Sequence, residues 1–309
     1  DGASVIVTCD CGITAHDAVA RAKDLGIDVI VTDHHEPGPK LPAATAVINP
    51  KRADAGYPFP ELAGVGVAFK FAQGVVRKLG YDEDAFCSKF VDLAALGTVA
   101  DVVPLVDENR TLVKFGLEAI PSSKKVGLRT MLKCARLVGK PLNSYSLAYI
   151  LGPRINAVGR MEDASAALEL FLTRDEAEAH GLACQLERCN SERKAEQDRI
   201  MAEAVELLDR KNIDPGSSPG LRVIVLSREG WNSGVIGIVA GKICETYGRP
   251  AILISRDEAS GMGRGSARSI DALNMYDALC ACGTLLGSFG GHALAAGLSI
   301  PLANLDEFE

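Results

Sequence analysis

Short apolar runs and one amphipathic segment alternate along the first fifty residues. The β-branched run ASVIVTC covers residues 3–9, DVIVT covers 28–32, and a third short run covers 46–48. Between the first two runs, apolar residues from 16 to 25 recur at helical spacing. Strand, helix and strand joined by short connections form a parallel sheet with right-handed crossovers. The pattern therefore predicts an α/β domain that begins with a parallel sheet.

Helical patterns dominate the middle of the chain. Residues 61–120 combine apolar faces with glycine-containing turns, and residues 162–211 are rich in Ala, Leu, Glu and Arg. The charged second half of the latter stretch predicts one long, largely solvated helix that links two lobes. We expect this helix to end at NIDPGSSPG, residues 212–220, because Pro, Gly and Ser are typical of a linker.

A second α/β lobe is predicted beyond the linker. RVIVLS at 222–227 and PAILIS at 250–255 are predicted strands, and the segment between them, 234–248, has a helical pattern. The chain is therefore expected to have three parts. They are a parallel-sheet domain over residues 1–161, a long connecting helix with its linker over 162–220, and a smaller α/β domain over 221–309.

Length and composition narrow the classes of protein. The 309 residues are 47% hydrophobic but contain no apolar run of ~18 residues, so we expect a two-lobed cytoplasmic protein that does not enter a membrane. Nine cysteines without a Cys-x-x-Cys pair favour reduced thiols over a disulfide framework or a zinc site. The net charge of −7 argues against polyanion binding by overall charge, but it leaves room for a local basic groove. No GxxxxGK[ST] loop or first-strand GxGxxG is present, which argues against a nucleotide-driven motor and the usual dinucleotide site.

Acids and histidines follow the predicted strands directly. Asp10 comes after the first run, and Asp33, His34 and His35 come after the second. The carboxyl ends of neighbouring parallel strands meet at one sheet edge, which is where open α/β proteins bind ligands. Three consecutive polar groups after an apolar strand are costly as purely structural residues. Taken singly, each residue also fits a helix cap, a turn or a hydrogen-bonded core histidine.

Asp101 completes a candidate metal site. It lies between GTVA and VVPL, apolar surroundings in which a carboxylate needs a partner. The carboxylates of Asp10 and Asp101 with the imidazole of His34 form a mixed oxygen and nitrogen donor set, which suits Mn²⁺ and tolerates Mg²⁺. Two such ions ~4 Å apart can activate a water and stabilise the leaving oxygen of a phosphodiester.

Basic and glycine-rich segments are candidates for phosphate contacts. Paired glycines let backbone N–H groups approach an anion, and charged side chains add charge-assisted hydrogen bonds. Tight-turn packing is the alternative for the glycines, and helix capping with surface charge is the alternative for the arginines. The candidates are Arg154, Asn156 and Arg160 in GPRINAVGRMED (152–163), Arg268 and Ser269 in GRGSARS (263–269), and Gly290, Gly291 and His292 in GSFGGHALAAG (287–297).

Seven ordered motifs across both lobes resemble the DHH phosphoesterases, and most closely the RecJ-type single-stranded-DNA exonucleases with a DHHA1 domain. The resemblance spans nearly the whole chain. The motifs are IVTCDCGIT (6–14), VTDHH (31–35), LGTVADVVPL (96–105), GPRINAVGRM (152–161), WNSGVIGIVAGK (231–242), GSARS (265–269) and GGHALAAG (290–297).

The resemblance implies a metal-dependent exonuclease that removes nucleotides from the 5′ end of single-stranded DNA in recombination and repair. It implies that Asp10, His34 and Asp101 bind two Mn²⁺ or Mg²⁺ ions, with Asp33 and His35 at their side. The groove between the lobes of such enzymes admits only single strands. The implied partners are single-stranded DNA, a single-stranded-DNA-binding protein and a helicase. The DNA backbone would meet Arg160, Arg268 and His292.

One departure from the family pattern concerns the metal site. The family carries an additional acidic motif upstream of the one that contains Asp10, so the chain is expected to be an internal fragment with an incomplete two-metal site. Three other functions stay open. They are a relative that cleaves short oligonucleotides or cyclic dinucleotides, a noncatalytic replication scaffold of the same fold, and a small-molecule-binding α/β protein.

Overall fold

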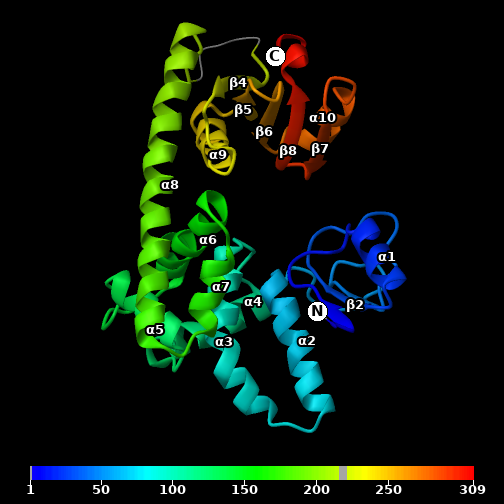
Figure 1. Ribbon diagram of the computed structural model, residues 1–309, viewed down its shortest axis with the longest axis vertical. Helices are drawn as coiled ribbons and strands as arrows, with labels where there is room; N and C mark the ends of the chain where they lie inside the picture. Colours follow the sequence, from blue (N-terminus) through cyan, green and yellow to red (C-terminus); the bar gives the residue numbers. More distant parts are fainter. Residues whose placement is uncertain (1, 216–220) are drawn as a thin grey trace. The chain divides into compact units, whose positions relative to one another are not determined.

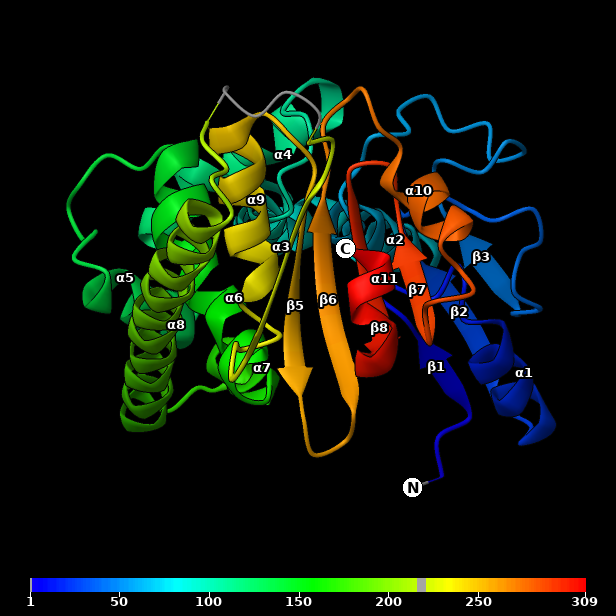
Figure 2. The same cartoon turned by 90° about the horizontal axis from the view of Figure 1, so that it is seen from above.

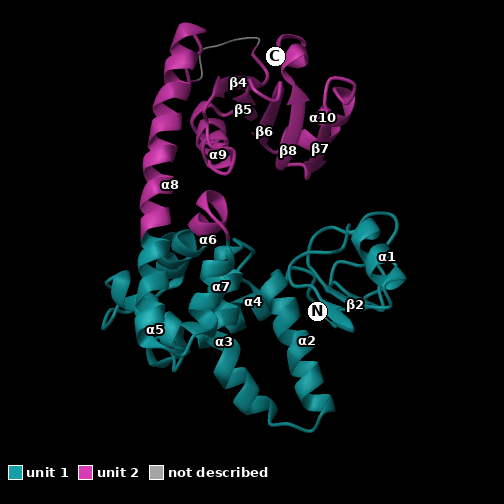
Figure 3. Cartoon of the chain, viewed as in Figure 1, with its two compact units in different colours: residues 1–156, 164–187 teal, residues 157–163, 188–309 magenta. Residues whose placement is uncertain are grey.

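The computed structural model describes residues 2–215 and 221–309, which form two compact units. Unit 1 comprises Asp1–Asn156 and Ala164–Glu187, and unit 2 comprises Ala157–Asp163 and Arg188–Glu309 (Figure 3). The last part of the predicted linker, residues 216–220, lies outside the described residues. Within the described part of the chain, no helix combines the length and the apolar content that a membrane span requires.

The predicted parallel sheet is confirmed in unit 1. Its strands are β1 (Val5–Val7), β2 (Asp28–Thr32) and β3 (Ala46–Ile48), in that order, with both pairings parallel. Helix α1 (His16–Asp24) makes the first crossover, and its buried Val19 and Ala22 pack with Val29 and Val31 of β2. All three side chains of β1 are exposed, so β2 supplies the buried strand of this sheet.

Helices form the remainder of unit 1. Helices α2, α3 and α4 lie in one group in Figure 1, and α3 contacts both of the others. Val67, Val91 and Leu112 from these three helices share one core. The elements are α2 (Gly64–Lys78), α3 (Glu83–Ala100), α4 (Asp107–Ala119), the 3-10 turn η1 (Ile120–Ser122), α5 (Val126–Cys134), the π-helix η2 (Ser146–Leu151), α6 (Gly152–Met161) and α7 (Ser165–Leu172).

The predicted long connecting helix is confirmed, but it is shorter than residues 162–211 because a separate helix precedes it. Helix α7 ends at Leu172, and the long helix α8 runs from Glu176 to Arg210. The break is stabilised by side chains that bond to the backbone: Thr173 Oγ1 accepts from the Asp175 N–H, and Asp175 Oδ1 accepts from the Glu178 N–H. The compact units divide within α6 and α8, and the expected three-part division at residues 161 and 220 stays a prediction.

Unit 2 is a mixed five-stranded sheet with helices on both faces. The alternation along β5 shows this directly, because Ala251 and Leu253 face a core with α8 and α9, whereas Ile252 and Ile254 face a core with α10. The elements are β4 (Ile224–Glu229), α9 (Ile236–Tyr247), β5 (Ala251–Asp257), β6 (Met262–Arg268), α10 (Met275–Ala281), β7 (Ser288–Gly291), β8 (Ala295–Pro301), the 3-10 turn η3 (Leu302–Asn304) and α11 (Leu305–Phe308).

The glycine-rich segments of unit 2 are largely strands and not the turns that their composition suggested. The sheet order is β4-β5-β6-β8-β7, with β5 and β6 antiparallel (Figure 2). A Cβ on Gly263 would lie 2.8 Å from the Ile254 side chain, and one on Gly265 would lie 2.8 Å from Leu298. Glycine is therefore needed in β6 because its neighbours on β5 and β8 are large.

Candidate metal centre and anion site

Backbone pairing brings Asp10 beside the residues that follow β2. The Thr8 N–H donates to the Ile30 carbonyl at 2.9 Å, and the Asp10 N–H donates to the Thr32 carbonyl at 3.0 Å. Asp10 has a φ of 63°, a left-handed conformation that is uncommon outside glycine and that turns the chain out of the strand. The carboxylate thus faces the start of the next loop, which holds His34.

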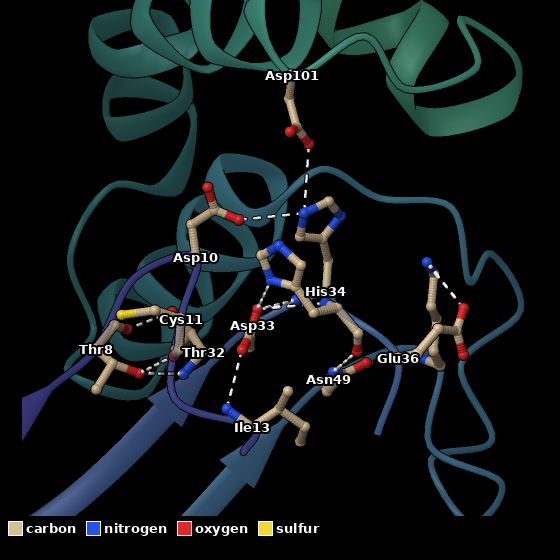
Figure 4. A network of polar contacts seen from close by, with 12 residues as sticks. Thr8, Asp10, Cys11, Ile13, Thr32, Asp33, His34, Glu36, Asn49 and Asp101 are labelled. Atoms are coloured by element: carbon tan, nitrogen blue, oxygen red, sulfur yellow. Dashed lines mark hydrogen bonds and ion pairs between the residues drawn. The ribbon is translucent and has the colours of Figure 1, made fainter. Parts of the chain in front are cut away.

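Three ligand candidates from distant parts of the sequence converge on one nitrogen. His34 Nε2 lies 3.1 Å from Asp10 Oδ1 and 3.4 Å from Oδ2 of Asp101, the residue that follows α3 (Figure 4). His34 is buried, yet its Nε2 has no hydrogen-bond partner among the described residues. A buried ring nitrogen that faces two carboxylate oxygens without a hydrogen bond is the arrangement expected of atoms that surround a cation.

Asp33 holds His34 and His35 in position through hydrogen bonds. Its Oδ2 accepts from the Ile13 N–H at 2.9 Å, and its Oδ1 accepts from the His34 N–H at 2.8 Å and contacts His35 Nδ1 at 2.7 Å. Burial alone would raise the pKa of Asp33, but these hydrogen bonds hold the pKa below its ordinary value. Asp33 is therefore an ionised acceptor, and the His35 Nδ1 carries the proton that it accepts.

The surroundings of His34 and Asp101 shift both pKa values upward. The Asp10 contact is the main cause that raises the pKa of His34, and burial opposes it. Burial is the main cause that raises the pKa of Asp101, and the nearby Asp10 charge adds to it. Both pKa shifts favour the protonated forms of His34 and Asp101. A divalent cation would replace these protons, because metal ligands must be deprotonated.

Gly64, the first residue of α2, leaves room for the Asp10 carboxylate. A Cβ at position 64 would lie 2.1 Å from Asp10 Oδ1 and 2.5 Å from its Cγ, distances at which one group must move. The start of α2 also offers the positive end of a helix dipole to this carboxylate. Sequence reasoning missed Gly64 because its contact with Asp10 spans more than fifty residues.

The donor set fits a divalent cation such as Mn²⁺. Ligand atoms of Asp10, His34 and His35 all lie within 4.8 Å of one another, and Asp101 adds a carboxylate on the other side of His34. Mixed carboxylate and imidazole donors suit Mn²⁺ and Mg²⁺ better than soft metals. The structure thus brings together all five residues predicted for this centre: Asp10, Asp33, His34, His35 and Asp101 (Figure 4).

A second polar site lies within unit 2, where β6 passes the start of α9. Arg268 is half-buried, donates to Ser266 Oγ at 3.2 Å and to the Ala267 carbonyl at 2.8 Å, and forms no ion pair with a described carboxylate. A Cβ on Gly237 of α9 would lie 2.7 Å from Ser266 Oγ and 3.1 Å from Arg268 Nη2. Burial, and next the charge of Arg160, lower the pKa of Arg268. These features fit a site that receives an anion.

Arg160 belongs to the same unit. It is exposed, its Nη1 donates to the Gly234 carbonyl at 2.9 Å, and Gly234 leaves no room for a Cβ beside the Arg160 backbone. The loop before α9 is held by Asn232, whose Oδ1 accepts from the Gly234 N–H at 2.8 Å. Ser266, Gly237 and Asn232 were not predicted individually, although GSARS and WNSGVIG contain them.

The other residues that were predicted to contact nucleic acid differ in their exposure and in their hydrogen-bond partners. Asn156 is exposed, but Arg154 is bonded to Glu187 at 2.5 Å and to the Ile150 carbonyl. The Ser269 hydroxyl donates to the Leu273 carbonyl at 2.8 Å, which leaves this hydroxyl as an acceptor only. These assignments stay predictions.

The remaining three candidates lie at the end of β7 and directly after it, where the chain turns toward β8. Gly290 is exposed, and Gly291 has a φ of 146° and lies so close to Ala295 and Ala296 that no Cβ fits. The His292 N–H donates to the Ala295 carbonyl at 2.7 Å. The turn therefore requires Gly291 for packing, whatever else it contacts.

Comparison with known proteins identifies two domain families in the chain. The model described as "DHH family, N-terminal domain" matches residues 3–98, and the model of the "DHHA1 domain" matches residues 220–309. The chain is 42% identical over 299 residues to the "Single-stranded-DNA-specific exonuclease RecJ" of Bacillus subtilis, with 97% of this chain and 36% of the relative covered.

Two solved structures resemble the whole chain. One is RecJ in complex with Mn²⁺ from Thermus thermophilus, with a TM-score of 0.85 and 35% identity over 99% of this chain and 43% of that one. Another is the exonuclease RecJ bound to manganese, with a TM-score of 0.82 and 36% identity over 99% of this chain and 73% of that one. The chain spans between about a third and just over half of the curated relatives' length.

Replacing Gly64 with Ala should weaken binding of Mn²⁺ by about 10- to 100-fold, since the new Cβ displaces the Asp10 carboxylate without removing a ligand. Calorimetric titration of the metal-free chain with Mn²⁺ measures this change. Gly74→Ala is the matched control, because Gly74 lies in the same helix with nothing within 4 Å of a Cβ. Equal Mn²⁺ affinity in Gly64→Ala and the unaltered chain would show that Asp10 is not a ligand.

Replacing Asp33 with Asn should lower the free energy of unfolding by about 1–3 kcal/mol near pH 6, because buried N–H donors lose a charged acceptor. The folded pKa is depressed, so this stabilisation is fully present above the ordinary value of 3.8 and is lost as the pH falls through the folded pKa. Urea unfolding of both proteins in EDTA at pH 6 and pH 3 checks this. An undiminished difference at pH 3 would contradict the ionised role of Asp33.

Proposed function

The chain belongs to the RecJ group of the DHH family, and we propose that it is the core of a metal-dependent 5′ to 3′ exonuclease acting on single-stranded DNA in recombination and repair. The observation that carries the proposal is the convergence of Asp10, His34 and Asp101 on a ring nitrogen without a hydrogen-bond partner among the described residues. The names of the relatives support single-stranded DNA as the substrate.

We propose that Asp10, His34 and Asp101 hold Mn²⁺ or Mg²⁺. Both solved relatives described above bind manganese. When bound, such ions activate a water and stabilise the leaving oxygen of a phosphodiester. The protein's contribution is to hold these three donors close together through strand pairing at Asp10, helix α3 before Asp101 and the hydrogen bonds of Asp33 beside His34.

Asp33 and His35 have a supporting role in this proposal. Because ionised Asp33 accepts from Nδ1 of His35, the other ring nitrogen, Nε2, is the one that is left to contact a ligand. The ligand atoms of His35 and Asp10 lie within 4.8 Å of each other, so His35 can ligate a cation or accept a proton near the scissile phosphate. Asp33 is then a positioning residue that acts through His35.

The anion site of unit 2 is proposed to bind the DNA backbone. The guanidinium of Arg268, the hydroxyl of Ser266 and the exposed Arg160 supply donors without a competing carboxylate at Arg268. A phosphodiester group satisfies such donors well, because charge-assisted hydrogen bonds to phosphate are among the stronger ones in proteins. The further proposed contacts are Arg154, Asn156, Ser269, Gly290, Gly291 and His292.

The proposed substrate defines the proposed partners. An exonuclease restricted to single strands requires DNA that has been unwound, so a helicase and a single-stranded-DNA-binding protein are the partners that this function calls for. Its place would be the compartment that holds the DNA, which is the cytoplasm in bacteria such as those that supply its relatives.

Replacing Asp10 with Ala should lower Mn²⁺-dependent hydrolysis by more than about 100-fold while single-strand binding is retained, because a ligand is lost but the arginines are not. Nucleotide release from 3′-labelled single-stranded DNA measures this, with Asp24→Ala, an exposed acid of α1, as the control. The assay uses both the 309-residue chain and the longest natural reading frame that contains it.

Hydrolysis by Asp10→Ala at the unaltered rate would show that Asp10 does not belong to the metal centre. Hydrolysis of dinucleotides but of no longer strand by either unaltered protein would overturn the proposed substrate.

Replacing Arg268 with Ala should weaken single-strand binding and reduce the slope of log affinity against log salt by about 1, because one phosphate contact is lost. Fluorescence anisotropy between about 50 and 200 mM salt measures this slope. Arg222→Ala removes an exposed arginine of the same unit and serves as the control. An unaltered slope in Arg268→Ala would indicate that Arg268 has a packing role.

A further inference from the structure

Two neighbouring tyrosines are exposed on the surface of unit 1. Tyr145 and Tyr149 expose 62% and 70% of their area, and their ring centroids lie 4.8 Å apart with the planes tilted by 33°. The chain is poor in aromatic residues, at 5%, and its largest aromatic side chain, Trp231, is buried. The tyrosine pair therefore leaves considerable aromatic surface in water.

The backbone that carries the pair is firmly anchored. Tyr145 precedes the π-helix η2 and Tyr149 lies within it, while Leu147 and Leu151 of the same helix are completely buried. The helix start is fixed by Asn143, whose Oδ1 accepts from the Ser146 N–H at 3.0 Å and from its hydroxyl at 3.1 Å. The apolar side of η2 thus holds the helix in place while the tyrosines face solvent. Short π-helical segments recur at functional sites.

The tyrosine pair lies close to the metal centre, because the backbone segments that carry the two sites pack against each other. A Cβ on Gly152, which directly follows η2, would lie 3.4 Å from the Ala100 Cβ and 3.7 Å from its Cα. Ala100 immediately precedes the ligand candidate Asp101. Given the usual spacing of Cα atoms in helices, the Tyr149 backbone lies on the order of 15 Å or less from that of Asp101. Stacked bases rise about 3.4 Å each along one strand, so the pair is within reach of the first few nucleotides of a bound strand.

The surroundings favour nucleobases over an apolar protein surface as the ligand. The exposed residues directly before the pair, Asn143 and Ser144, are polar, as is the exposed Asn156 after it. The exposed apolar residues Val138 and Pro141 are not adjacent to the pair in sequence. A protein partner that buries aromatic side chains usually meets a broader apolar patch. Nucleobases instead need only a ring face, and stacking on aromatic side chains accepts any base sequence.

We propose that Tyr145 and Tyr149 form a stacking platform for the bases of a single strand whose phosphodiester lies at the metal centre. The inference rests on the proposed function and adds a base-contacting site to it. Stacking would position the strand without selecting its sequence, and it would exclude duplex DNA because paired bases present no free ring face.

Single abasic nucleotides test the platform directly. Binding is measured by anisotropy in Ca²⁺ with 5′-phosphorylated 12-mers that carry one abasic site at each of the first six positions. An abasic site at the stacked position should weaken binding to the unaltered protein by about tenfold. Tyr149→Leu should weaken binding of the intact strand to a similar degree and should lose the penalty at that position only. This loss of a position-specific penalty identifies a direct contact, as in a double-mutant cycle.

Two control variants separate stacking from general damage. Tyr149→Phe keeps the ring and should retain the abasic profile. Tyr81→Leu removes a tyrosine that is equally exposed, at 70%, but lies beyond the far end of α2, and it should bind like the unaltered protein. Tyr149→Leu with unchanged affinity, or with the same abasic profile as the unaltered protein, overturns the platform while the proposed nuclease stands. An unaltered protein that binds no single strand would overturn both.

Discussion

The close approach of two carboxylates to one imidazole nitrogen is the constraint around which unit 1 is arranged. The two carboxylates repel each other and the ring of His34 is buried, so the protein must hold the three groups together by other means. Strand pairing fixes the backbone of Asp10, α3 fixes that of Asp101, and four hydrogen-bond donors to Asp33 fix the histidine loop. The left-handed conformation of Asp10 shows that local backbone preference yields to this arrangement.

The two units divide the chemistry between them by charge. Unit 1 gathers acids and histidines at the end of a parallel sheet, whereas unit 2 gathers arginines and small residues where a strand passes a helix start. Carboxylate and imidazole donors suit a divalent cation, whereas guanidinium and hydroxyl donors suit an anion. A chain with a net charge of −7 thus keeps a local cluster of donors that suits an anion.

The sequence predicted those features that depend on local pattern. Residues 28–32 and 46–48 were predicted as strands with the observed ends, and the position of Asp10 and Asp33 after neighbouring strands was enough to place them at one sheet edge. The features that were missed depend on contacts between distant residues. The glycines of β6 are strand residues because of side chains on β5 and β8, and Gly64 matters because of Asp10. Exposure of the tyrosine pair follows from packing of η2, which no local pattern reveals.

Helix α8 belongs to both compact units, and this has a consequence for how the chain unfolds. Its first turns pack within unit 1, and Ile200, Ala204 and Leu208 complete a core of unit 2. Helix formation is cooperative along the backbone, so melting of either core exposes a free helix end that frays into the other. Excision of either unit at a conventional linker would therefore leave an uncovered core. The two units are therefore expected to fold together, and transfer of one unit alone into another protein is disfavoured.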